Sequence, residues 1–255
     1  MRVVSLQSGS NGNCIYVEAG GVRLLFDAGI SGKQARERLA HHDIEIEGVD
    51  ALLISHDHVD HSRSIGVYQR KFRLPVYVTA ETLRAAAARH AIGELSDVCH
   101  FRAGATLRFG TVAVETIPTP HDGADGVAFV VDDGRSRLGI LTDLGHVFAG
   151  LDGVIRSLDA VLLESNYDPR MLASGSYPPM LKHRIRGPGG HLSNVEAAEL
   201  LLDAATRRLR WACLAHLSHE NNTPGLALAT HRRVLGSALP LCVATRYGAS
   251  EVMQL

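Results

Sequence analysis

The chain has 255 residues, enough to bury a sizeable core within one large domain. Its hydrophobic content of 45% is ordinary for a soluble protein, and its net charge of −1 excludes a global basic field. No apolar run approaches the roughly 20 residues of a membrane span, and the start lacks the apolar core of a signal peptide. The four cysteines form no C-x-x-C pair, which is typical of reduced thiols. We expect a soluble, cytoplasmic chain that forms a single domain over residues 1–255 and has no membrane partner.

Short apolar runs that alternate with amphipathic stretches predict a mixed chain of strands and helices. The strands are expected at residues 23–27, 51–55, 75–78, 106–109, 112–117, 127–131, 138–141, 160–163 and 211–215. Helices are expected after Ser31, near residues 81–90, from Ser193 through Leu201 and from Pro224 onward. Ser193-x-x-Glu196 is a capping box, and proline is favoured at a first helical position. The pattern alone predicts an α+β (mixed α/β) chain.

Residues 168–190 form the one long stretch without a clear period. This stretch is rich in Pro, Gly and basic residues, and we expect an irregular functional loop there. Lys182, Arg184 and Arg186 are candidates for binding phosphate groups that flank a scissile bond. An ordinary solvated loop is the alternative interpretation.

The most informative run is SHDHVDHS at residues 55–62, directly after an apolar strand. His56 and His58 are two residues apart, so on extended backbone they point the same way. Asp60 and His61 follow after a turn and can face a second metal ion. Without a cation, these polar side chains at a buried strand end would lack partners. A ligand set of nitrogen and oxygen atoms suits Zn²⁺, Mn²⁺ or Fe²⁺, and the sequence does not choose among them.

The H-x-H-x-D-H pattern of this run resembles the metallo-β-lactamase superfamily, and the resemblance extends over essentially the whole chain. It implies a four-layer α-β-β-α sandwich with two divalent metal ions, which together lower the pKa of a shared hydroxide. The implied ligands are His56, His58 and His121 for one ion, Asp60, His61 and His216 for the other, and Asp143 as a bridge. Asp27 matches the aspartate that braces the metal loop, and Asp60 is counted among the catalytic residues as well.

Four further segments resemble the YycJ-type (WalJ-type) group, which lies near ribonuclease Z and the cyclic-phosphate phosphodiesterases. The segments are SGSNGNC at residues 8–14, LESNYD at 163–168, GGHLSNVEAAELL at 189–201 and HLSHENNTP at 216–224. This resemblance implies a 5′-to-3′ DNA exonuclease that acts on single-stranded DNA or DNA ends, with a role in DNA repair.

His191 and Glu164 make independent physical sense as a catalytic pair. His191 comes just before a capped helix start, where free N–H groups and the helix dipole favour an anion. Glu164 follows a strand, and if it reaches the ring it orients the ring and keeps it protonated for a leaving alkoxide. A simple structural cap is the alternative role for His191.

We therefore expect a dinuclear-metal phosphodiesterase that cleaves by a metal-activated hydroxide. The open alternatives are a hydrolase of small cyclic phosphates or of a lactone or thioester, and a metal-free scaffold. The basic stretch and the pair of His191 and Glu164 favour a phosphodiester, because neutral substrates need neither. The scaffold is disfavoured because every expected ligand is present.

Overall fold

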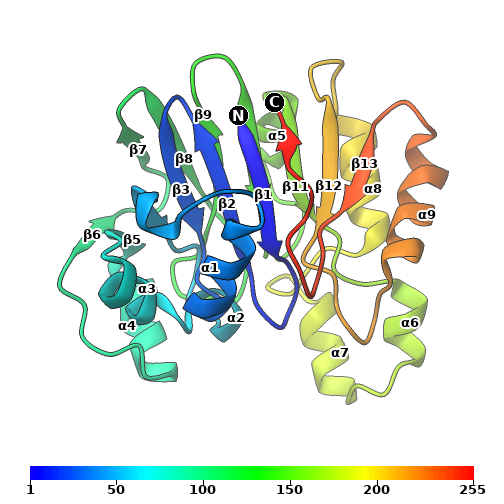
Figure 1. The fold of residues 1–255 in the computed structure, drawn as a ribbon. Coiled ribbons are helices and arrows are strands. Elements are labelled where there is room, and N and C mark those ends of the chain that lie inside the picture. The colour runs from blue at the N-terminus through cyan, green and yellow to red at the C-terminus, as the bar shows by residue number, and fades with distance from the viewer.

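Two seven-stranded sheets face each other in the computed structural model, which describes residues 1–255, and helices cover their outer faces (Figure 1). The first sheet has the order β14 (Met253–Gln254), β1 (Arg2–Gln7), β2 (Cys14–Ala19), β3 (Val22–Phe26), β4 (Ala51–Leu53), β5 (Val76–Thr79), β6 (Val98–Phe101). The second has the order β13 (Leu241–Val243), β12 (Trp211–Ala215), β11 (Ala160–Glu164), β10 (Arg137–Leu141), β9 (Val127–Asp132), β8 (Val112–Pro118), β7 (Thr106–Phe109).

Each sheet is mixed, with one antiparallel half and one parallel half. In the first sheet, β14 to β3 pair antiparallel and β3 to β6 pair parallel. In the second sheet, β7 to β10 pair antiparallel and β10 to β13 pair parallel. The carboxyl ends of parallel strands meet at one edge of a sheet, which is where open α/β sheets place their ligands.

The helices form the two outer layers and one end of the molecule. Their bounds are α1 (Gly32–Ala40), η1 (Ile46–Gly48), α2 (Val59–Ser62), α3 (Ile65–Phe72), α4 (Ala80–Arg89), α5 (Leu151–Arg156), α6 (Pro169–Ser174), α7 (Pro179–Arg186), α8 (Asn194–Ala204) and α9 (Pro224–Leu235). Helices α1 and α3 pack on the first sheet, and α5 and α8 pack on the second. Helices α2, α6 and α7 gather at the end away from the two termini (Figure 1). None of the helices is long and apolar enough to cross a membrane.

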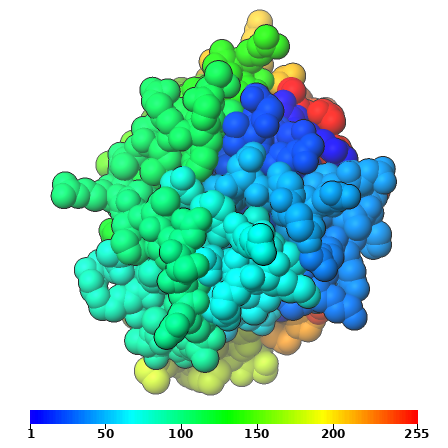
Figure 2. Space-filling model, turned by 60° about the vertical axis from the view of Figure 1, so that its left-hand side comes forward, coloured from blue at the N-terminus to red at the C-terminus, as the bar shows by residue number.

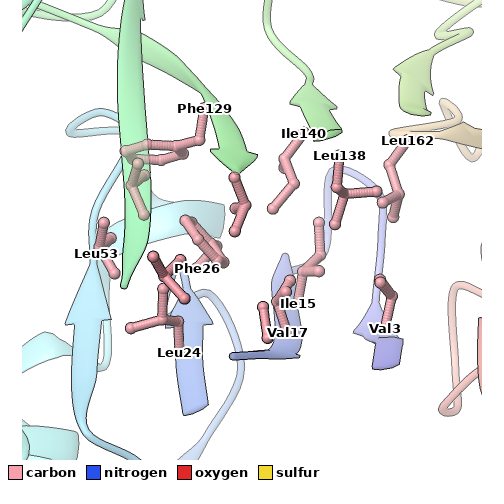
Figure 3. Packing of buried hydrophobic residues seen from close by; sticks show 14 of the residues in the cluster. Val3, Ile15, Val17, Leu24, Phe26, Leu53, Phe129, Leu138, Ile140 and Leu162 are labelled. Atoms are coloured by element: carbon pink, nitrogen blue, oxygen red, sulfur yellow. The ribbon is translucent and has the colours of Figure 1, made fainter. Parts of the chain in front are cut away.

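Side chains that alternate along the strands fill the space between the sheets and the space under the helices. On β3, Leu24 and Phe26 point toward the second sheet, whereas Leu25 points toward α1 and α3. Figure 3 shows the layer between the sheets, where Phe26 meets Phe129 with ring centroids 5.1 Å apart. Because the strands are buried on both faces, the sandwich forms a rigid frame around the edge where the strands end.

The four-layer sandwich predicted from the sequence is confirmed, and the predicted strands lie within two residues of the observed ones. The expectation of an irregular loop at residues 168–190 is wrong, because α6 and α7 occupy most of it. The Asp168 side chain caps α6 by accepting hydrogen bonds from the backbone N–H groups of Arg170 and Met171. A small apolar cluster around Leu172 and Ile185 then anchors both helices.

Helices α6 and α7 also form part of the outer surface beside the frame. In Figure 2 the yellow-green surface of this segment forms the lower end of the molecule, beneath the cyan and blue segments of the first half. The N-terminal and C-terminal residues lie together elsewhere, where the Met1 amino group donates a hydrogen bond to the Leu255 carbonyl at 2.8 Å.

Gly29 is a position at which no side chain fits. A Cβ there would lie 1.6 Å from the Asp60 carbonyl oxygen and 2.5 Å from the Asn13 nitrogen, both backbone atoms. Gly29→Ala should therefore displace α2 and lower the free energy of unfolding by about 1–3 kcal/mol. Thermal unfolding measures this loss.

Gly153→Ala is the matched control, because Gly153 lies in α5 with open space where its Cβ would be. It should raise the free energy of unfolding by about 0.5–1 kcal/mol, since alanine is the better helix former. A Gly29→Ala protein that unfolds at the wild-type temperature would contradict the packing described here.

Candidate metal centre

Three residues that follow strands adopt left-handed backbone conformations at one edge of the sandwich. Asp27 follows β3, Asp143 lies just after β10, and His216 follows β12, with φ angles of 64°, 55° and 54°. Such conformations cost free energy for residues other than glycine, and they persist where the surrounding structure holds them. Here they turn three polar side chains into the gap between the two sheets.

The SHDHVDHS run crosses from β4 to the short helix α2 at the same edge. His58 occupies the N-cap position of α2 in extended conformation without a side-chain capping bond, and Asp60 and His61 lie within the single turn of the helix. The backbone of this run is tied to the turn after β3, because Ala28 N–H donates to the His61 carbonyl at 2.7 Å. His56 and His58 therefore precede the helix on extended backbone, whereas Asp60 and His61 project from the helix itself.

Six of the predicted ligands gather in two neighbouring groups of three. The potential ligand atoms of His56, His58 and His121 lie within 4.8 Å of one another, and so do those of Asp60, His61 and His216. The closest approaches are 3.2 Å between His121 Nε2 and His58 Nδ1, and 3.4 Å between His216 Nε2 and Asp60 Oδ2.

Asp143 lies between the two groups and is almost fully buried. Its Oδ1 is 3.6 Å from His121 Nε2 and 3.5 Å from His216 Nδ1, and its Oδ2 is 3.3 Å from His61 Nε2. A carboxylate in this position reaches toward both groups. This is the position expected for the bridging ligand that the family resemblance implied.

Two buried polar atoms in the cluster have no hydrogen-bond partner, namely His56 Nε2 and Asp143 Oδ2. A buried group left without a partner costs about 1–3 kcal/mol, so native proteins rarely retain one without a reason. Burial, together with the neighbouring His61, lowers the pKa of His56 well below its usual value, which keeps this ring neutral with a free lone pair. The donor set of imidazoles and carboxylates therefore fits two divalent cations of the Zn²⁺, Mn²⁺ or Fe²⁺ type.

Asp27 holds His61 in the orientation that such a cation needs. Its Oδ1 accepts hydrogen bonds from Ser55 N–H and Ser55 Oγ, both at 2.8 Å, and its Oδ2 accepts one from His61 Nδ1 at 2.7 Å. The proton is thereby kept on Nδ1, and Nε2 faces the cluster. His121 is held in the same way, because its Nδ1 donates to the Gly190 carbonyl at 2.8 Å.

The electrostatic field at this edge favours positive charge. Burial opposes the charged form of His61, but the carboxylates of Asp143 and Asp27 outweigh burial and raise the pKa of His61 to about 9. Burial also disfavours the charged form of Asp60, yet the His61 and His216 rings hold the pKa of this carboxyl below its usual range. The carboxylates therefore remain ionised and attract a cation.

Glu164 and His191 form a hydrogen-bonded pair beside the cluster. Glu164 is fully buried at the end of β11, and its Oε1 accepts a hydrogen bond from His191 Nδ1 at 2.6 Å. Its Oε2 accepts another from the Leu144 N–H at 3.0 Å. Burial raises the pKa of Glu164, but the neighbouring His191 and His216 rings outweigh burial and hold the pKa below its usual value. The carboxyl therefore stays ionised. His191 Nδ1 also lies 3.6 Å from Asp143 Oδ1, which places the ring next to the proposed bridge.

The cluster opens into a cleft of about 640 Å³ whose walls come from both halves of the chain. Its floor includes Asp60, Asp143 and His216, and the His191 ring lines one side. Arg89 at the end of α4 and Arg184 on α7 also line the cleft, and each guanidinium is paired with an aspartate, Asp57 and Asp122 respectively.

The comparisons with known proteins agree with this geometry. The family model described as a beta-lactamase superfamily domain matches residues 22–216. The chain belongs to the metallo-β-lactamase superfamily. It is similar to the exodeoxyribonuclease YycJ of Bacillus anthracis, with 36% identity over 90% of this chain and 87% of that one. It is 37% identical to the exodeoxyribonuclease WalJ of Streptococcus pneumoniae serotype 2, over 91% of this chain and 87% of that one.

The fold matches a solved metallo-beta-lactamase fold protein, YhfI from Bacillus subtilis, with a TM-score of 0.74 at 17% identity over 98% of this chain and all of that one. Zn²⁺-bound PqqB from Methylobacterium extorquens superimposes with a TM-score of 0.75 at 18% identity, covering all of both chains. This likeness concerns the architecture, and it agrees with the two sheets and the outer helices described above.

The basic residues predicted to bind substrate do not lie together in the cleft. Arg184 lines the cleft, but its guanidinium makes two hydrogen bonds to Asp122, at 2.6 Å and 2.9 Å. Lys182 Nζ donates to the Ala173 carbonyl at 2.8 Å, and Arg186 Nε donates to the Lys182 carbonyl at 3.3 Å. Lys182 and Arg186 lie outside the cleft lining.

Several site residues escaped the sequence analysis. Asp122 lies 3.3 Å from His58 Nε2, and its position next to His121 was the available signal. Asp57 is fully buried within the metal run, where its Oδ1 accepts a hydrogen bond from the Ala124 N–H at 2.7 Å and its Oδ2 pairs with Arg89. Nothing in the sequence pointed to Arg89, because it is an ordinary basic residue at a helix end.

Asp27→Asn should reduce metal affinity about 10- to 100-fold, the usual effect of removing a residue that orients a ligand. An asparagine whose oxygen accepts from Ser55 turns its NH₂ toward His61 Nδ1, so the imidazole proton moves to Nε2 and blocks the lone pair. Competition with a chelator measures the change.

Asp43→Asn is the control, because Asp43 also has a left-handed conformation, with φ of 57°, but is exposed. Its metal affinity should equal that of the wild type. Equal affinities for Asp27→Asn and the wild type would show that the Asp27 contacts are not needed for ligation.

Proposed function

We propose that this chain is a dinuclear-metal phosphodiesterase that removes nucleotides from DNA ends. The observation that carries the proposal is the buried contact between Glu164 and His191, which holds an imidazole 3.6 Å from Asp143 inside the cleft. A positioned imidazole is what a poor alkoxide leaving group needs, because such a group must be protonated as it departs. The relatives named as exodeoxyribonucleases support the same reaction class.

The ions, when bound by the two ligand groups, supply Lewis-acid activation of water and stabilise charge on the phosphate. The Asp60 carboxylate lines the cleft and accepts a hydrogen bond from the attacking water. His191 keeps one proton on Nδ1 for Glu164 and delivers the other from Nε2 to the departing sugar oxygen. The ionised Glu164 holds the ring in this orientation by accepting the hydrogen bond from Nδ1.

The substrate is a polyanion, and the cleft that receives it is lined by Arg89 and Arg184, each paired with an aspartate. We assign these two residues to phosphates next to the scissile one. Lys182 and Arg186 lie on α7 outside the cleft lining, and we assign them to phosphates farther along a single strand. The 5′-to-3′ direction, Zn²⁺ or Mn²⁺ as the ions, a role in DNA repair and a cytoplasmic location belong to the same proposal.

A nuclease assay tests the proposal directly. The substrates are single- and double-stranded DNA and RNA, each labelled at the 5′ or 3′ end, with Mn²⁺, Zn²⁺ and Mg²⁺ tested separately. We expect stepwise release of nucleotides from the 5′ end of DNA. Hydrolysis of a small cyclic phosphate, a lactone or a thioester without any DNA cleavage would overturn the proposal.

His191→Ala should slow cleavage of an oligonucleotide by about 10²- to 10⁴-fold, the usual contribution of general acid catalysis. The same change should slow hydrolysis of a thymidine p-nitrophenyl phosphodiester much less, because p-nitrophenolate leaves without protonation. Turnover numbers on the two substrates give the ratio.

His183→Ala on α7 serves as the matched control, since this histidine is exposed and should leave both rates unchanged. Metal content should be the same in all three proteins. Equal slowing on both substrates, or loss of metal from His191→Ala, would reject the role of proton donor.

A further inference from the structure

A second hollow of about 520 Å³ lies beside the cleft and is not used by the chemistry described above. Its walls come from the segment after β12, the start of α9 and the segment after β13. Ser218 lines both this hollow and the cleft, so the two spaces are neighbours. Ser218 is two residues beyond His216, which places the hollow next to the ligand cluster.

The hollow combines apolar walls with an exposed aromatic rim. Leu217 and Val243 contribute apolar surface, and the rings of His219 and Tyr247 stand nearly perpendicular, with centroids 6.4 Å apart. The Tyr247 residue is 71% exposed, although most aromatic side chains of this protein are buried or half-buried. A large ring kept in solvent beside a hollow offers a stacking face at little conformational cost.

Arg246 adds a fixed positive charge to the same wall. Its guanidinium donates a hydrogen bond to Asn11 Oδ1 at 2.9 Å and another to the Leu217 carbonyl. These bonds hold the cation between the turn after β1 and the hollow. The hollow therefore combines apolar walls, an aromatic rim and one guanidinium group that hydrogen bonds hold in place.

We propose that this hollow, here called the base pocket, holds the sugar and base of the nucleotide adjacent to the scissile phosphodiester. The inference rests on the proposed function and names a binding site for its substrate. Tyr247 stacks on the base, His219 forms the second aromatic wall, and Arg246 faces the linking phosphate. The pocket volume falls within the usual range of about 300–1,000 Å³ for small-ligand sites.

A nucleotide fits these features better than other occupants. Every base has a flat apolar face, so stacking on tyrosine tolerates any sequence, as an exonuclease requires. The continuity with the cleft through Ser218 means that a strand with one phosphate at the ligand cluster can place its next nucleotide here. An unconnected small molecule would not need that continuity.

Position-specific removal of a single base tests the inference. The probes are 3′-fluorescein-labelled oligothymidylates with phosphorothioate linkages that resist cleavage, each with one abasic residue at a different position. Their affinity for the metal-loaded protein is measured by fluorescence anisotropy. In the wild type, loss of the base at one position near the 5′ end should weaken binding about 5- to 150-fold, the usual effect of losing one stacked base.

Tyr247→Ala should weaken binding of the intact probe by a similar factor and abolish the sensitivity at that one position. Tyr247→Phe should behave like the wild type, because the ring and not the hydroxyl does the stacking. His41→Ala, an exposed histidine at the end of α1, should change neither value. Thermal unfolding of each variant checks that the fold is intact.

The outcomes separate the pocket from the proposed function. If a folded Tyr247→Ala protein binds every probe as the wild type does while the wild type degrades DNA, the base pocket is rejected and the function stands. If the wild type neither binds these probes nor cleaves DNA, both are rejected. Sensitivity to abasic residues that persists in Tyr247→Ala also rejects the pocket.

Discussion

The buried carboxylate of Asp143 stands among imidazoles, one of which keeps a ring nitrogen without a partner, and the rest of the site depends on this arrangement. One of its oxygens has no hydrogen-bond partner, and neither has Nε2 of His56. Burying charged groups costs several kcal/mol unless they are paired or bind a metal. Two cations would supply the missing partners for both ligand groups at once. The hydrogen bonds that the Asp27 carboxylate and the Gly190 carbonyl accept from His61 and His121 have a clear purpose, because each directs the other ring nitrogen toward the place of an ion.

The sandwich makes this cluster possible by bringing strand ends from both halves of the chain to one edge. The left-handed backbone at Asp27, Asp143 and His216 stores strain that is compatible with folding only because both faces of the strands are packed. Gly29 contributes through its missing side chain, which lets the backbone of α2 lie against the turn after β3. The chemistry and the core packing are therefore coupled, since each ligand group takes residues from both sheets and a shift of either sheet would pull its members apart.

The sequence predicted much of this site because metal ligands come as a compact pattern. The run SHDHVDHS, the pair Glu164 and His191, and the strands before them were visible without coordinates. Other features were not visible, for physical reasons. Strand β1 is buried at five of its six residues, so it lacks an alternating pattern. Helix α6 depends on the Asp168 cap, α7 begins at Pro179 without a side-chain cap, and a three-residue apolar cluster rather than a long apolar period holds both helices. Arg89 reaches Asp57 only through tertiary packing, and no local pattern encodes that contact.

The central claim, that this cluster is built for two metal ions, is tested most directly by crystallography with anomalous scattering. Crystals grown with Mn²⁺ or Zn²⁺ should be measured at the absorption edge of the metal. We predict two peaks, one among His56, His58 and His121 and one among Asp60, His61 and His216, with Asp143 contacting both. A single peak, or imidazoles that are hydrogen-bonded to protein and water with no metal between them, would contradict the account.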